Sequence, residues 1–199
     1  FQREDFIGIF KAMDGKPVTI RLVDPPLHEF TPKDDAGVEK LSKITGITPE
    51  NIRHRCEQLH ESNPMLGHRG CRLCITYPEI LDMQVTAIIE AAIACAKKGV
   101  KVLPEIMIPL VGLVKELKDH KTIVDRVAAE VMKEQGVKIK YLVGTMIEIP
   151  PGAVTAGEIA SEAQSFPFGT TALTRLTFDL PRPHGATLRH TDTHPNTPR

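Results

Sequence analysis

The sequence has no net charge, no long apolar run and no N-terminal targeting pattern. Its 25 Lys and Arg residues balance 25 Asp and Glu residues, so the formal net charge is zero and nothing favours a nucleic-acid partner. No apolar run approaches the roughly 20 residues that span a membrane. The N-terminus FQREDFIGIF lacks the basic and apolar regions of a signal peptide. These absences predict a cytoplasmic protein, or an organellar one in a eukaryote, with neither a nucleic-acid nor a membrane partner.

Cysteine is scarce as well. The 199 residues include only four cysteines, which are Cys56, Cys71, Cys74 and Cys95. A mid-sized chain without a secretion signal favours reduced thiols over a disulfide framework. Cys71 and Cys74 form a CxxC pair with histidines nearby, but a second such pair is missing, so we assign no zinc site.

The chain also lacks an initiator Met and begins inside a predicted helix, so we expect a fragment or a processed product. The remaining composition is ordinary for a globular protein, with 41% apolar and 25% charged residues. A chain of this length can form one domain with a sizeable core.

Strand and helix patterns alternate along the sequence. Runs rich in apolar and β-branched residues predict strands at 18–23, 100–110, 139–149 and 165–169. Helical spacing, cap residues and glycine stops predict helices at 3–13, 48–60, 80–98, 113–135 and 156–163. The nearly continuous apolar run at 100–110 is typical of a strand that is buried on both faces. This order predicts βα units around a parallel sheet, in either a barrel or a doubly wound fold.

The last twenty residues differ from the rest. Residues 180–199 hold four prolines and three histidines but almost no large apolar side chain. Such a segment cannot bury enough surface to offset the entropy lost on ordering. We therefore predict a folded domain over 1–179 and a disordered tail over 180–199.

Three charged residues fall at or near the ends of predicted strands or in a turn-rich segment. Arg21 lies within an apolar strand, Arg69 lies in the turn-rich segment 63–72, and Glu148 lies late in a buried strand. Arginine forks match phosphate and carboxylate oxygens, and a carboxylate with substrate phosphate suits Mg²⁺. The alternatives are structural: Arg21 paired with a carboxylate such as Asp24, a solvated Arg69, and Glu148 in an ion pair. The functional interpretation is a phosphorylated, anionic substrate bound with Mg²⁺.

Four segments around these residues resemble the pyruvate, phosphate dikinase family. They are VTIRLVDPPLHEF (18–30), NPMLGHRGCRLCITYPEI (63–80), PEIMIPLVG (104–112) and VGTMIEIP (143–150). The resemblance covers 1–179 and implies the phosphoenolpyruvate/pyruvate-binding domain, an α/β fold of the (β/α)8 TIM-barrel type. A complete barrel takes about 250 residues, so we predict an incomplete barrel. Its open sheet edges should be covered by dimerisation, which predicts a homodimer, or by irregular packing.

The resemblance also implies an activity. Family members are phosphotransferases that interconvert ATP, phosphate and pyruvate with AMP, pyrophosphate and phosphoenolpyruvate, and a phosphohistidine domain carries the phosphoryl group between sites. By this resemblance, Arg21 and Arg69 bind the substrate phosphate and carboxylate. Thr170 and Thr171 stand at substrate-binding positions, and Glu148 is a Mg²⁺ ligand.

The sequence departs from the family pattern in places that matter for activity. The family motif GTNDLTQ reads GTTALTR at 169–175, so Ala172 replaces the second Mg²⁺ carboxylate and Thr171 replaces an Asn. Pro151 replaces the Arg of MIEIPR. The general-acid Cys, the phosphocarrier His and the ATP-grasp domain of the family are absent from this chain. We therefore expect the isolated chain to be inactive. The alternatives are a truncated or degenerate barrel with a binding or structural role only, and a domain like that of phosphoenolpyruvate synthase.

Overall fold

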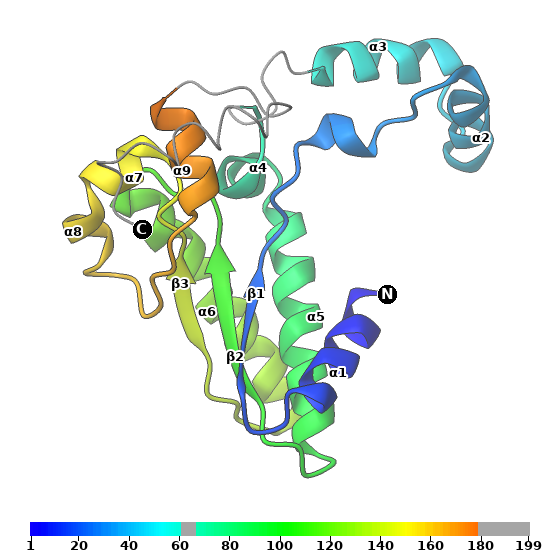
Figure 1. Cartoon of the computed structure of the whole chain (residues 1–199). Helices are drawn as coiled ribbons and strands as arrows, with labels where there is room; N and C mark the ends of the chain where they lie inside the picture. Colours follow the sequence, from blue (N-terminus) through cyan, green and yellow to red (C-terminus); the bar gives the residue numbers. More distant parts are fainter. Residues whose placement is uncertain (61–66, 179–199) are drawn as a thin grey trace.

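Three parallel strands form the sheet, and the order in space follows the order in the chain (Figure 1). The strands are β1 (Pro17–Arg21), β2 (Leu103–Ile108) and β3 (Leu142–Thr145). In the register, Ile20 lies opposite Ile106, which lies opposite Val143. The computed structural model describes residues 1–60 and 67–178, so the predicted tail at 180–199 lies outside the described residues.

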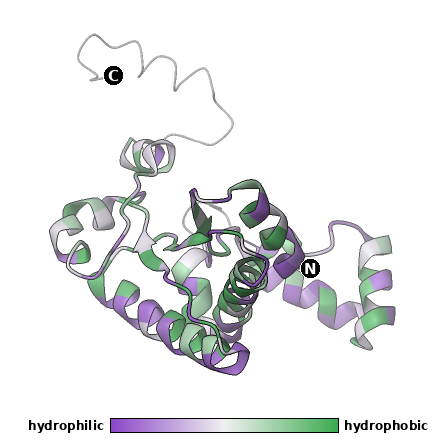
Figure 2. Cartoon of the chain, turned by 90° about the horizontal axis from the view of Figure 1, so that it is seen from below, coloured by the Kyte–Doolittle hydropathy of each residue, from purple (hydrophilic) through white to green (hydrophobic). Residues whose placement is uncertain are grey.

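Two long helices connect the strands and form the core with them. They are α5 (Pro78–Ala96), which precedes β2, and α6 (Val114–Gln135), which joins β2 to β3. The first helix, α1 (Gln2–Ala12), packs on α5. Both connecting helices lie behind the sheet in Figure 1, and their buried side chains form one cluster with those of the strands. Seen from below, hydrophobic residues gather in the helices at the centre and hydrophilic ones cover the outer surfaces (Figure 2).

Strands β1 and β2 are more deeply buried on one face than on the other, whereas Val143 to Thr145 of β3 are all buried. In β1 and β2, side chains alternate between buried and more exposed positions. Ile106 is 1% exposed, whereas Leu103, the first residue of the same strand, is 36% exposed. The expectation of a strand buried on both faces at 100–110 is therefore wrong for β2, because Glu105 and Met107 on its second face are only partly buried.

Two α-helices and a short 3-10 helix form an arm that extends from the body (Figure 1). The arm contains η1 (Leu27–Phe30), α2 (Asp35–Thr45) and α3 (Pro49–Leu59). The N-cap Thr48 accepts a hydrogen bond from Asn51 N at 3.4 Å, which confirms the predicted start of α3. The sequence patterns missed η1 and α2, although Asp34 caps α2 by accepting from Gly37 N at 2.8 Å.

The C-terminal part differs most from the predicted elements. It contains α7 (Pro150–Val154), α8 (Ala156–Ile159) and α9 (Thr170–Thr177). The predicted strand at 165–169 is reduced to one parallel bridge between Ile147 and Phe168. The helix expected at 156–163 ends at Ile159, and β3 ends at Thr145 rather than 149. Short segments that bend around glycines and prolines lack the length that a periodic pattern needs.

The described residues thus confirm βα units around a parallel sheet, and the fold is of the α/β class. Within residues 1–60 and 67–178 the sheet does not close into a barrel. None of the helices in these ranges is both long and apolar enough to cross a membrane.

Candidate functional site

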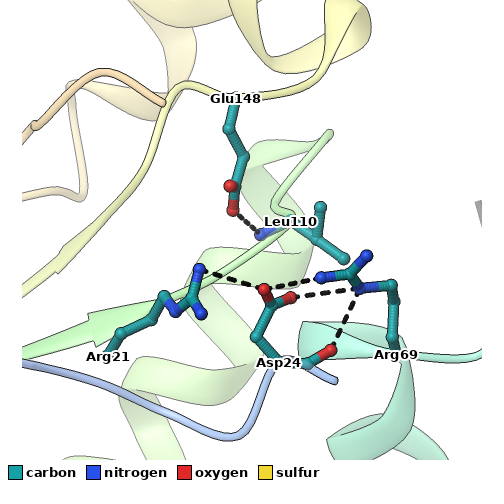
Figure 3. Close-up of polar contacts among 5 residues, drawn as sticks. All are labelled: Arg21, Asp24, Arg69, Leu110 and Glu148. Atoms are coloured by element: carbon teal, nitrogen blue, oxygen red, sulfur yellow. Dashed lines mark hydrogen bonds and ion pairs between the residues drawn. The ribbon is translucent and has the colours of Figure 1, made fainter. Parts of the chain in front are cut away.

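The charged residues that the sequence singled out meet at the carboxyl edge of the sheet (Figure 3). Arg21 is the last residue of β1, and Glu148 follows β3 by three residues. Arg69 is the N-cap of α4 (Gly70–Thr76), a helix that the sequence patterns did not predict. Parallel strands end at the same edge, so side chains that follow different strands face one region. Arg21, Arg69 and Glu148 therefore line one pocket.

Asp24 holds the two arginines together. Its side chain is buried, and its Oδ2 accepts from Arg21 Nη1 at 3.0 Å and from Arg69 Nη2 at 2.7 Å. Arg69 Nε also donates to the Asp24 backbone oxygen at 3.0 Å (Figure 3). The structural alternative for Arg21, pairing with Asp24, is therefore observed, and the same pairing fixes both guanidinium groups at the strand ends. Sequence reasoning treated Asp24 only as a partner and missed that it bridges both cations.

Glu148 is a buried carboxyl group, only 3% exposed, with one fixed partner. Its Oε1 accepts a hydrogen bond from Leu110 N at 2.8 Å. Burial raises the pKa of the Glu148 carboxyl above its ordinary value, and the Asp24 carboxylate adds to the increase. The Leu110 N–H and the charges of Arg21 and Arg69 oppose the increase but do not cancel it. The structural alternative for Glu148, an ion pair, does not appear among the described contacts.

The backbone around Glu148 is tightly specified. Leu110 has φ 60°, a left-handed conformation that is unfavourable for a residue with a branched side chain. This conformation directs its N–H to Glu148. On the other side, a Cβ on Gly169 would lie 2.4 Å from Glu148 Cβ, so only glycine fits at this point before α9. The loop after β2 and the start of α9 together position the carboxyl group.

Helix α4, which follows Arg69, is anchored through Cys71. Cys71 N donates to Pro109 O at 3.1 Å, its Sγ donates to Leu110 O at 3.2 Å, and its carbonyl oxygen contacts His120 Nε2 at 2.9 Å. Burial raises the pKa of the Cys71 thiol to about 12 and that of Cys74 to about 11. These thiols stay protonated near neutral pH, and we assign them a packing role.

The charged side chains at the carboxyl edge of the sheet line a pocket of about 240 Å³. Of the predicted site residues, Arg21, Arg69, Glu148, Thr171 and Ala172 line it. Thr170, the first residue of α9, is outside its lining.

Among the other residues that line this pocket, sequence patterns did not assign a binding role to Asp24, Glu29, Leu110 and Arg175. The arginine at 175 was visible as a departure in the GTTALTR segment, but its position in the pocket depends on how α9 folds back over the sheet edge. The pocket therefore carries three arginines and three carboxyl groups.

This arrangement can bind a small anion with two charged groups. The fixed guanidinium forks supply donors that suit phosphate and carboxylate oxygens. Within the described ranges no group of three or more His, Cys, Asp and Glu side chains could hold a metal ion by itself. A cation at Glu148 would therefore need oxygen ligands from the bound molecule, which is the usual mode for Mg²⁺.

The comparisons with known proteins agree with this geometry. A sequence model of the family described as "PEP-utilising enzyme, PEP-binding domain" matches residues 1–197. Pyruvate, phosphate dikinase from Rhizobium meliloti (strain 1021) is 53% identical over 186 residues, which are 93% of this chain and 21% of that protein. The chloroplastic enzyme of Flaveria trinervia is 54% identical over 184 residues, 92% of this chain and 19% of that protein.

The enzyme of Giardia intestinalis is 55% identical over 182 residues, 92% of this chain and 21% of that protein. The chain therefore spans about a fifth of the length of the curated relatives it matches. The family match covers nearly the whole chain, including every strand and every pocket residue. The chain belongs to the family of PEP-utilising enzymes, as a PEP-binding domain.

Proposed function

We propose that this chain is the phosphoenolpyruvate/pyruvate-binding part of a pyruvate, phosphate dikinase. Such an enzyme converts ATP, phosphate and pyruvate to AMP, pyrophosphate and phosphoenolpyruvate through a phosphohistidine. The observation that carries the proposal is the pair of fixed arginines, Arg21 and Arg69, in one pocket with Glu148. High identity to dikinases over more than 90% of the chain supports it.

In this proposal the arginines hold the substrate and stabilise charge on the phosphoryl group. Phosphoryl transfer needs mainly positioning and electrostatic stabilisation from the protein. Arg69 is 15% exposed at its side chain and is tied to Asp24 by several contacts, so its guanidinium is already oriented before an anion arrives. Arg21 is 44% exposed and has one contact to Asp24, so it is the cation that can turn toward the substrate more readily.

Mg²⁺ fits this pocket with Glu148 as its protein ligand. A buried carboxyl group whose pKa is raised lacks compensating positive charge, and a divalent cation would supply it. Ala172 offers no oxygen, so substrate oxygens and water would complete the ligand set. The bound ion would neutralise charge on the substrate phosphate, and Glu148 would hold it in place. Thr170 and Thr171 remain candidate substrate contacts, of which Thr171 is supported by its place in the pocket wall.

The same proposal extends to the rest of the protein. The domain, over 1–179, is part of a (β/α)8 barrel, and the open face of its sheet is the inner face of that barrel. Its partners are a phosphohistidine domain of the complete enzyme and a second copy of the chain in a homodimer. We place the protein in the cytoplasm or in an organelle, because the relative from Flaveria trinervia is named as a chloroplastic enzyme.

Two alternatives remain, of which one has a supporting observation. Ala172 at a metal-ligand position favours a degenerate domain that binds without catalysis. A domain of the phosphoenolpyruvate synthase kind shares the barrel, and an upstream ATP-grasp domain in the gene would fit either enzyme. A phosphate-dependent reaction of the full-length protein would identify the dikinase.

Titration calorimetry on the purified chain tests the proposal. Phosphoenolpyruvate and pyruvate should both bind, and Arg69→Ala should weaken both by roughly 100-fold, because truncating a buried charged partner of an anion costs about 3 kcal/mol. Arg53→Ala is the matched control, since Arg53 is paired with Asp35 on the distant arm. Absence of binding to the parent chain, or equal affinity in the Arg69 variant, would contradict the proposal.

A further inference from the structure

A third arginine, Arg175, differs from the other two cations of the pocket. It lies on α9, three residues after Ala172, and lines the pocket with Arg21 and Arg69. Its Nε is buried and has no hydrogen-bond partner among the described residues. A buried donor without a partner is unfavourable, so an acceptor oxygen of a ligand that reached this Nε would stabilise it.

The ion pairs of Asp24 show how Arg175 differs from Arg21 and Arg69. Asp24 accepts from both Arg21 and Arg69, so that one carboxylate serves two guanidinium groups. Among the described residues no carboxylate pairs with Arg175. The wall formed by α9 is thus electropositive where Ala172 leaves no acidic side chain. An anion entering the pocket meets an arginine there whose Nε has no hydrogen-bond partner within residues 1–60 and 67–178.

We propose that Arg175 is a third anion contact of this site, and that its guanidinium donates to the phosphoryl group of a small phosphorylated carboxylic acid. The inference rests on the proposed function, because it takes phosphoenolpyruvate as the ligand. It adds that Arg175 supplies positive charge to the phosphoryl group, which offsets weaker Mg²⁺ binding where Ala172 replaces a carboxylate. Phosphate recognition in this chain therefore depends less on a divalent metal than in a pocket with two metal-binding carboxylates.

The choice of the phosphoryl group follows from the charge of the ligand. A phosphoryl group has three oxygens and about two negative charges, and the two forks at Asp24 do not satisfy all of them together with a carboxylate. Pyruvate has the carboxylate but no phosphoryl group. Arg175 should therefore contribute to binding of phosphoenolpyruvate and not to binding of pyruvate.

The test is calorimetry with phosphoenolpyruvate and with pyruvate, each in EDTA and in excess Mg²⁺. Arg175→Gln should weaken phosphoenolpyruvate binding in EDTA by roughly tenfold or more, the loss expected for one charge-assisted hydrogen bond. Pyruvate affinity should stay close to that of the parent chain, and Arg175→Lys should restore part of the loss. Arg53→Gln on the arm is the matched control, and thermal melting checks that each variant is folded.

The outcomes separate this inference from the proposed function. If the parent chain binds neither ligand, the proposed function fails. If the parent binds both and Arg175→Gln binds phosphoenolpyruvate equally well in EDTA, only the inference about Arg175 is overturned. An equal loss for pyruvate and phosphoenolpyruvate would also overturn it, because Arg175 would then act on the carboxylate or on the shape of the pocket. Should the glutamine variant fail to fold, Arg175→Lys gives the same comparison with the charge kept but the fork removed.

Discussion

The two ends of the sheet contain cavities of similar size and opposite character. At the carboxyl ends, the pocket of about 240 Å³ is lined by arginines and buried carboxyl groups. At the amino ends, a cavity of about 290 Å³ is lined mainly by apolar side chains from the first residues of each strand, among them Pro17, Leu103 and Leu142. The same three strands form both, so the difference comes from the residues that follow the strands and not from the sheet itself.

The carboxyl end of the sheet has the features of a binding site, and the amino end has those of a packing surface. Asp24 and Glu148 are each 3% exposed at the carboxyl end, and burying a carboxylate is unfavourable unless it is paired, as Asp24 is with Arg21 and Arg69. At the amino end, Leu103 and Leu142 are 36% and 39% exposed, and no described element covers them. We expect ligands at the first end and further polypeptide over the second.

At the charged end of the sheet, the largest effect on stability should come from removing Asp24. Asp24→Ala leaves two guanidinium groups without their shared partner, and loss of one partner of a buried ion pair typically costs about 3–5 kcal/mol. Because Arg21 is partly exposed, we expect about 3 kcal/mol in urea denaturation. Asp82→Ala, which removes an exposed partner of Arg126, should change stability by less than about 1 kcal/mol. Similar losses for the two variants would show that the carboxyl end is not special.

Glu148→Gln should stabilise the fold while weakening metal binding. The folded state raises the pKa of Glu148, so this group stabilises the fold below its unfolded pKa, and that contribution is lost as pH rises through the higher folded pKa. Above that pH the parent contains a buried charge that the variant lacks. Each unit of increase corresponds to roughly 1.4 kcal/mol, and glutamine can keep the hydrogen bond from Leu110 N.

Denaturation at several pH values measures this effect. The gap between variant and parent should grow as pH rises and vanish in acid, and Mg²⁺-dependent binding of phosphoenolpyruvate should fall. A variant that is less stable than the parent at neutral pH would show that the Glu148 charge is already well compensated.

Ala172→Asp should strengthen Mg²⁺-dependent ligand binding at the carboxyl end of the sheet, because it supplies a second carboxylate. Calorimetry should show severalfold tighter phosphoenolpyruvate binding in Mg²⁺, in line with about 1 kcal/mol for one additional ligand in a partly exposed pocket. The gain should be larger with Arg175→Gln in the same chain, because Arg175 lies one turn away and would otherwise pair with the new aspartate. Equal affinity of Ala172→Asp and its parent would show that position 172 is not a ligand.

The smallest effect should come from the amino end. Leu142→Ala removes a side chain that is already 39% exposed in this chain, so we expect a loss of less than about 1 kcal/mol and no change in ligand affinity. Ile106→Ala, on the buried face of the same sheet, is the contrasting variant and should cost about 2–5 kcal/mol. A large loss for Leu142→Ala would mean that this end is already covered in solution.

The sequence predicted the long elements and the principal charges of the site. Helices α1, α3, α5 and α6 have caps or apolar periodicity over several turns, and the strands have β-branched runs. Arg21 and Glu148 were found because a charge at the end of an apolar strand is unusual. Each of these signals lies within a few residues of the chain, where local patterns are informative.

The parts that sequence patterns missed depend on contacts between distant residues. Asp24 and Arg69 are 45 positions apart, and no local pattern indicates that one carboxylate bridges two arginines. Helix α4 starts at Gly70, which has φ 59° and lies so close to the Leu110 side chain that a Cβ would not fit. The lining role of Arg175 requires α9 to pack where Gly169 meets Glu148. These features follow from tertiary packing, which overrides local preference.

The hydrogen bonds between Asp24 and Arg69 also close the base of the helical arm, since the chain leaves the body after one residue and returns before the other. The entropy of closing a loop changes only slowly with its length. Insertions or deletions within the arm should therefore be tolerated as long as the hydrogen bonds between Asp24 and Arg69 are kept. In an evolving family or an engineered variant, the arm is the place where the chain can change length, or accept a grafted peptide, without disturbing the arginines a few residues away.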